Sequence, residues 1–133
     1  MDTSDGFVDL TGRQFGFTVD PIEPGRVWWI TRPTGTFTKP FFGVEPTNEV
    51  IETAPQSMGV LFSKEGKVVK FNMGTPIDRT AGNSGGMGGL FAFLHFVGKP
   101  LPIRECQPYQ MSFRFRLLTG IGNLASKLAK KDE

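Results

Sequence analysis

Residues 35–79 constrain the fold more than any other part of this 133-residue chain, because they carry the pattern of long antiparallel strands. The segment 64–67 contains Gly66 and suits a tight hairpin loop. After this loop, residues 68–75 largely alternate between apolar and polar side chains, which is the period of a strand. The apolar positions of this return strand are Val69, Phe71 and Met73. The stretch therefore predicts a hairpin that presents one apolar face.

Two further segments have the composition of strands. Residues 26–31 are β-branched or aromatic at most positions, which predicts a strand that is covered on both faces. Residues 49–63 predict a second long strand that is bent near Pro55. A corner rich in Pro and Gly at residues 40–46 separates the two segments.

Two segments near the carboxyl end predict helices. Residues 90–97 are apolar on all sides and are followed by Gly98 and Pro100, so we expect a short, buried helix. A second, amphipathic helix is expected within residues 104–133, because apolar residues recur there at spacings of three and four. Its stripe consists of Phe113, Leu117, Ile121, Leu124 and Leu128. Gly120 and Gly122 weaken the helix in the middle.

We divide the chain into an extended arm at residues 1–25 and a single domain at residues 26–133. The domain comprises the strand region 26–79, a Gly-rich loop with a short apolar helix at 80–103, and the carboxy-terminal helix at 104–133. The arm is polar with isolated aromatic residues, and we expect Phe7, Phe15 and Phe17 to pack it against the core or a neighbour.

Composition excludes several classes of function. The net charge of +2 gives no general attraction to nucleic acid. The single cysteine, Cys106, allows no internal disulfide or cysteine-based zinc cluster, and we expect no cofactor or metal. The first twenty residues contain four Asp and no apolar run, so no signal peptide is predicted. The compartment is left open.

The order of motifs in residues 27–79 resembles the NTF2-like superfamily, especially its SnoaL-like branch. The matching motifs are a G-x-x-x-x-P corner at residues 35–40, a Pro-Thr turn at 43–47, and a hairpin closed by Glu-Gly-Lys at 65–67. The resemblance implies an α+β fold in which a curved antiparallel sheet wraps around helices and holds a pocket in its concave face. The Gly-rich loop and residues 98–102 resemble an extension in algal and plastid-associated relatives, which implies an organellar, photosynthetic setting.

The chain departs from this family in two ways. Nothing before Arg26 resembles the amino-terminal helices that cap the family's cone. Phe37 stands where the family's first corner often has His, and Met73 stands where family cyclases have an acidic residue. Since Phe and Met cannot transfer a proton, cyclase or isomerase activity of the family type is not expected.

Other candidate sites have structural interpretations. Ser84 lies in a G-x-S-x-G sequence, but the only histidine follows it without the intervening acid that a hydrolase triad needs. The surrounding loop at 82–89 is interpreted as a tight turn, with anion binding as the alternative. His95 is interpreted as a core or interface residue, with pigment or haem ligation as the alternative. We expect Asp78 to form a local turn and Cys106 to be structural.

Three functional hypotheses follow. The first is a non-catalytic interaction module, an accessory subunit of a larger and organellar assembly, whose partner contacts are Leu90, Phe91, Phe93, Leu94, His95 and Phe96. The second is a protein that binds a hydrophobic molecule or pigment in a pocket formed by Trp29, Phe37, Phe71 and Met73. The third is a SnoaL-like isomerase or cyclase. The basic carboxy-terminal helix is expected to dock on the sheet or on a partner protein, with an anionic membrane surface as the alternative.

Overall fold

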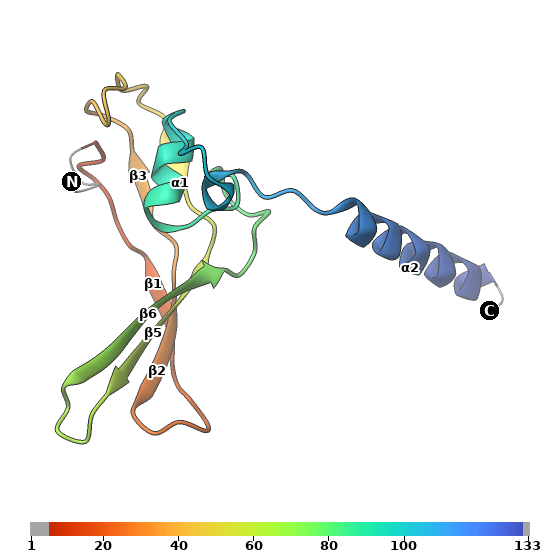
Figure 1. Cartoon of the computed structure of the whole chain (residues 1–133), viewed down its shortest axis with the longest axis horizontal. Coiled ribbons are helices and arrows are strands. Elements are labelled where there is room, and N and C mark those ends of the chain that lie inside the picture. Colours follow the sequence, from red (N-terminus) through yellow and green to blue (C-terminus); the bar gives the residue numbers. More distant parts are fainter. Residues whose placement is uncertain (1–5, 132–133) are drawn as a thin grey trace.

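The structure is a computed structural model that describes residues 6–131. The described residues form an α+β fold with antiparallel strands, which confirms the predicted fold class. The helices and strands are β1 (Gln14–Val19), β2 (Arg26–Thr31), β3 (Thr34–Thr36), β4 (Val50–Glu52), β5 (Gln56–Phe62), β6 (Val68–Pro76), α1 (Gly89–Phe96), the short 3-10 helix η2 (Arg104–Cys106) and α2 (Phe113–Lys131). Figure 1 shows them in sequence colours.

Four strands form the main sheet, in the order β1-β2-β5-β6, and β3 pairs with β4 in a separate two-stranded sheet. All of these pairings are antiparallel. The predicted hairpin is β5–β6, and its loop at 64–67 lies where the sequence indicated. The expected bend near Pro55 separates β4 from β5. Pro55 has no backbone N–H to donate to a neighbouring strand, and the backbone next to it forms its hydrogen bonds outside the strand pairs. The Ala54 N–H donates to the Ser84 hydroxyl at 3.2 Å.

A compact aromatic core lies at one end of the molecule, where β3, β4 and α1 meet. Phe7 is its centre: the Phe7 ring stacks on Phe37 with ring centroids 5.3 Å apart and meets the edges of Phe93 and Phe41 at 5.0 and 5.8 Å. All four rings are buried. The boundary that we expected at residue 25 does not separate an arm from the domain, since Phe7 fills the core and β1 is a strand of the sheet.

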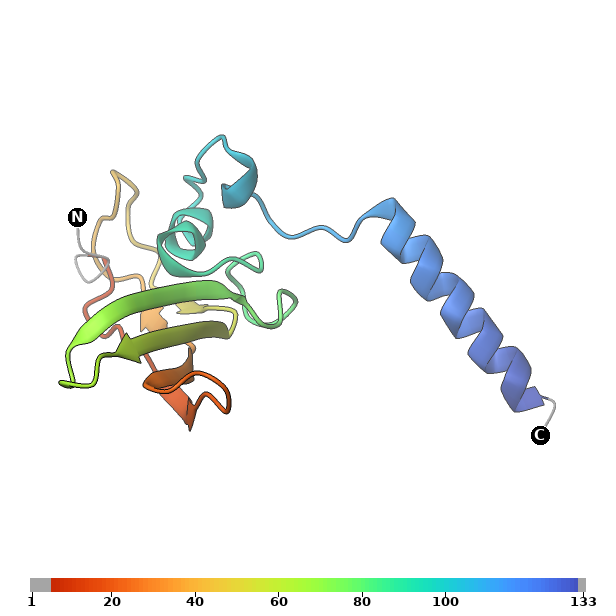
Figure 2. The same cartoon turned by 60° about the horizontal axis from the view of Figure 1, so that its bottom comes forward.

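The far half of the main sheet extends away from this core, as Figures 1 and 2 show. The prediction that β2 is covered on both faces is therefore wrong in part: Arg26 and Thr31 are buried, but Trp28 is exposed. Trp28 lies flat over Gly59 of the paired strand, where a Cβ atom would collide with the indole ring. A local polar network, described next, lies on the same side of the sheet as Trp28.

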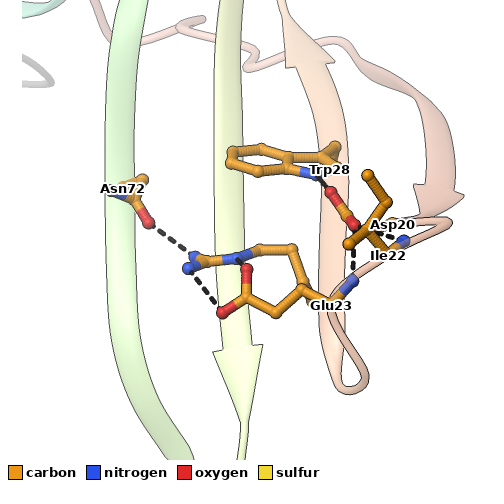
Figure 3. Close-up of polar contacts among 6 residues, drawn as sticks. Asp20, Ile22, Glu23, Trp28 and Asn72 are labelled. Carbon is orange, nitrogen blue, oxygen red and sulfur yellow. Dashed lines mark hydrogen bonds and ion pairs between the residues drawn. The ribbon is translucent and has the colours of Figure 1, made fainter.

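This polar network joins the β1–β2 turn to β6 (Figure 3). The Arg26 guanidinium donates to Glu23 at 2.9 Å and to Asn72 at 2.7 Å. The Trp28 indole N–H donates to Asp20 at 2.7 Å. Because Arg26, Trp28 and Asn72 come from strands that pair through β5, these bonds fix the polar face of the sheet. The apolar side chains of the sheet lie on the opposite face.

The carboxy-terminal helix α2 lies apart from the rest of the chain (Figures 1 and 2). None of its residues is buried. The expectation that this helix docks on the sheet is wrong for this structure, because its apolar stripe contacts no described strand. The helix is continuous through Gly120 and Gly122, the two residues that were expected to weaken it. Within residues 6–131 no helix combines the length and the hydropathy that crossing a membrane requires.

Candidate functional site

The apolar side chains of the main sheet share one face, which we call the apolar sheet face. Register places Val27, Val60 and Phe71 side by side, and Met58 beside Met73 on the same face. Phe17 of β1 joins them, because its ring stacks on Trp29 with centroids 5.6 Å apart. The members are Phe17, Val19, Val27, Trp29, Met58, Val60, Val69, Phe71 and Met73. None of them carries a charge.

Most of this apolar sheet face is exposed. Phe17 is 59% exposed, Phe71 is 55% exposed and Met73 is 62% exposed. Only Val60, in the middle strand, is buried. A contiguous apolar patch of this kind marks an interaction surface or a ligand groove in a soluble protein. Scattered single exposed apolar residues would carry no such meaning.

A cavity of about 770 Å³ lies at the end of the apolar sheet face that is nearest α1. Its walls include Met73, Pro76, Met87, Leu90 and Phe91. The polar residues at the same cavity include Arg79, Arg104, Glu105 and Tyr109. The Arg79 guanidinium lies 5.3 Å from the centre of the Tyr109 ring. The cavity is therefore mainly apolar with cationic groups among its lining.

The predicted pocket residues are only partly brought together. Trp29 and Phe71 are neighbours on the apolar sheet face, with ring centroids 6.2 Å apart, and Met73 follows on the same strand. Phe37 does not belong with them: it follows β3 in the other sheet and is buried against Phe7. The predicted site is corrected to Trp29, Phe71 and Met73. Sequence alone could not detect this, because the separation into two sheets is a tertiary feature.

The predicted partner-contact residues lie on α1, and the chain's own core takes up much of that helix. Phe93 and Leu94 are buried, and Phe96 packs against Phe7. His95 lies close to Gly85 of the Gly-rich loop. Only Leu90 of the predicted set is exposed, and with Phe91 it lines the cavity. The prediction that α1 is buried holds for Ala92, Phe93 and Leu94, and the aromatic core of the same chain covers this part of the helix.

The carboxylates with perturbed pKa values are fixed as anions. Hydrogen bonds from the Thr36 backbone and hydroxyl lower the pKa of Asp9. The Trp28 indole N–H, followed by backbone N–H groups of the β1–β2 turn, lowers the pKa of Asp20. The Thr80 hydroxyl and N–H lower the pKa of Asp78. A carboxyl that stays ionised holds a turn but does not serve as a general acid at neutral pH.

Ser84 is fully buried and its hydroxyl is occupied. It accepts from the Ala54 N–H at 3.2 Å and donates to the Met87 carbonyl at 3.0 Å. The serine therefore ties the Gly-rich loop to the β4–β5 bend. Within residues 6–131, no cluster of three His, Cys, Asp or Glu side chains is arranged to hold a metal ion.

Two features of the site were missed from the sequence. Arg79 meets Arg104 and Tyr109 at the cavity although it is distant from both in the chain, and no local signal indicated this. Phe17 joins the apolar sheet face through a register shift between Phe15 and Thr18. The positive φ of Gly16 marked the place, since glycine inside a strand pattern indicates a bulge.

Comparison with known proteins places the chain near two solved structures. No family model and no curated protein matches. AclR from Streptomyces galilaeus, provisionally assigned as a hydroxylase, aligns over 98% of this chain and 65% of its own, with 22% identity and a TM-score of 0.48. A protein from Jannaschia sp. CCS1, provisionally assigned as a SnoaL-like polyketide cyclase, aligns over 53% of this chain and 45% of its own, with 26% identity and a TM-score of 0.40.

The chain spans less than two thirds of the length of each of these two neighbours. Since both TM-scores are below 0.5, no functional argument rests on them.

Proposed function

We propose that the chain is a non-catalytic interaction module, an accessory subunit that binds a protein helix on the apolar sheet face. The observation that carries the proposal is the uncovered, uncharged surface formed by residues such as Phe17, Phe71 and Met73. Burying apolar area stabilises an association by roughly 25 cal/mol per Å² before the costs of binding. The setting in an organellar, photosynthetic assembly is part of this proposal and rests on the resemblance to plastid-associated relatives.

A helical partner fits this surface better than an added strand. The face is formed by side chains in the middle of a sheet, whereas strand addition uses the free backbone groups of an edge. A helix lays one apolar stripe on such a face and leaves its polar side in water. The partner is therefore expected to carry large apolar side chains at helical spacing.

Site-specific photo-crosslinking tests the proposal. A photoreactive phenylalanine at position 71 lies on the apolar sheet face, while the same residue at position 70 lies on the opposite face of β6. In extracts of the native source, position 71 is expected to crosslink to a protein. The crosslinked peptide of that protein is expected to carry apolar residues at helical spacing. Absence of a protein adduct, or equal adducts from positions 70 and 71, would overturn the proposal.

A second candidate function is binding of a hydrophobic molecule or pigment with an anionic group. It is favoured by the cavity of about 770 Å³, which combines apolar walls with Arg79 and Arg104. No described residue forms an ion pair with either guanidinium. Dodecanoic acid is expected to bind and dodecanol to bind at least fivefold more weakly, as measured by calorimetry. Equal binding of both, or binding that survives Leu90→Asp, would reject it.

The third hypothesis, a SnoaL-like isomerase or cyclase, would have to use this same cavity. Glu105 and Tyr109 are its candidates for proton transfer, since Met73 occupies the position of the family's acidic residue. Turnover of a polyketide cyclase substrate that Glu105→Gln abolishes would favour catalysis over binding.

A further inference from the structure

We propose that the helix on the apolar sheet face is α2 of a second copy, so that two chains exchange their carboxy-terminal helices reciprocally. This inference rests on the proposed function and names the partner. Its basis is that one chain carries both halves of the contact, an apolar helix stripe and an apolar sheet face. Within one chain the two surfaces do not pack against each other, and both are exposed.

The state of α2 indicates that it needs a partner. It is 19 residues long and no residue of it is buried. Most of the stability of a helix in a protein comes from packing of its amphipathic face, and α2 also contains Gly120 and Gly122, which weaken it. Its stripe exposes five large side chains, namely Phe113, Leu117, Ile121, Leu124 and Leu128. Packing on an apolar surface would supply the stability that its sequence lacks.

The dimensions of the two surfaces agree. At 1.5 Å per residue, α2 is roughly 28 Å long. At about 3.4 Å per residue, the nine residues of β6 extend for roughly 30 Å. Neighbouring strands lie about 4.8 Å apart, so two or three strands support one helix of about 10 Å diameter. The apolar sheet face is uncharged, whereas the five charges of α2 are all basic, so they must lie along its margins or face water. These are Arg114, Arg116, Lys127, Lys130 and Lys131.

The buried area approaches the range of specific interfaces only if both helices are exchanged. One helix footprint of roughly 28 by 10 Å removes about 560 Å² of accessible surface, counted on both partners. Two reciprocal contacts remove about 1,100 Å², which is close to the lower limit of about 1,200 Å² for specific interfaces. A reciprocal exchange also gives a closed two-fold assembly.

The hinge before α2 favours a second copy over the chain's own sheet. Tyr109 is held in place, because its N–H donates to the Gly85 carbonyl at 2.9 Å and its ring lies against Arg79. Only residues 110–112 then separate this anchor from the first turn of α2. The helix points away from its own sheet in both views (Figures 1 and 2). Short hinges that hold an element away from its own domain favour exchange between copies.

Crosslinking between two variants, each with one added cysteine, tests the exchange. Phe71→Cys places a thiol on the apolar sheet face and Ile121→Cys places one on the stripe of α2. The native Cys106 is fully buried, and the parent chain serves as the control for its reaction. The two variants, one of them ¹⁵N-labelled, are mixed, denatured, refolded together and oxidised, and mixed disulfides are counted by mass spectrometry.

We expect the mixed disulfide between positions 71 and 121 to exceed that of the matched controls at least tenfold. The controls are Lys70→Cys, on the opposite face of β6, and Asn123→Cys, on the polar side of α2. A chain that carries both Phe71→Cys and Ile121→Cys is oxidised in parallel. If the mixture gives no such excess but this double variant forms the disulfide within one chain, α2 is an internal cap and the exchange is overturned. If neither crosslink forms, the exchange is also overturned, while the proposed function is judged separately by whether position 71 captures a different protein.

Discussion

At the scale of single residues, the two tryptophans of β2 differ although they are adjacent in sequence. The Trp28 N–H donates to the Asp20 carboxylate, whereas the Trp29 Nε1 is buried and donates to no acceptor among the described residues. A buried donor without a partner costs about 1–3 kcal/mol. Alternation along a strand explains the difference, since the two side chains lie on opposite faces.

Replacing Trp29 by Phe should therefore cost little. The lost ring volume is offset by removal of the unsatisfied donor, so the free energy of unfolding is expected to stay within about 1 kcal/mol of the parent. Trp28→Phe, which loses the bond to Asp20, should destabilise more. Urea unfolding followed by circular dichroism measures both. A larger loss for Trp29→Phe than for Trp28→Phe would contradict this account.

Asp20 gives a prediction for pH. Its folded-state pKa is lowered below the ordinary value of 3.8, so it contributes stability that is present above that value and is lost as the pH falls through the folded pKa. The stability difference between the parent and Asp20→Asn should be largest near pH 7 and should shrink as the pH falls well below 3.8. Urea midpoints measured across this range check the trend. Glu65→Gln, at the other hairpin turn, is the control. A stability difference between the parent and Asp20→Asn that does not change with pH would argue against the network in Figure 3.

At the scale of elements, periodicity predicted most strands and helices because each pattern is local. The β5–β6 hairpin, the break near Pro55 and helix α1 all lie where spacing and turn residues placed them. Periodicity did not predict which residues pack against each element. Whether α1 faces a partner or the core depends on Phe7, which is more than eighty residues away in sequence.

The stripe of α2 gives a prediction at this scale. Leu124→Asp places a charge on the stripe, whereas Asn123→Asp places the same charge on the adjacent polar side. If α2 exchanges, Leu124→Asp should reduce the assembled fraction at least tenfold, and Asn123→Asp should leave it unchanged. Light scattering coupled to size exclusion, over a range of protein concentrations, gives the masses. Equal behaviour of the two variants would show that the stripe is not the contact.

At the scale of the whole molecule, the chain divides into a small aromatic core at one end and a sheet with an open face. The core draws on Phe7, Phe37, Phe41 and Phe93, which come from three segments that are distant in the chain. The amino-terminal residues are therefore part of the domain from Phe7 onward.

Phe7→Ala tests this division. A buried Phe to Ala change costs about 3–5 kcal/mol, which is a large part of the stability of a domain of this size. Val8, the next residue, is 59% exposed, and Val8→Ala should change stability by less than about 0.5 kcal/mol. Thermal unfolding compares the two. An arm that merely lies on the surface would give similar, small effects for both substitutions.

The sequence by itself determined strand β2, the β5–β6 hairpin, the helices α1 and α2, and the apolar stripes on β6 and α2, because alternation, helical spacing and turn residues act over a few neighbours. It did not indicate the strands β1 and β3. Only the tertiary structure decided which of these surfaces stay open. It put Phe37 in the core and left Trp29, Phe71 and Met73 on the exposed face, and it brought Arg79, Arg104 and Tyr109 to one cavity. The physical reason is that burial depends on long-range packing, whereas secondary structure follows largely from local pattern.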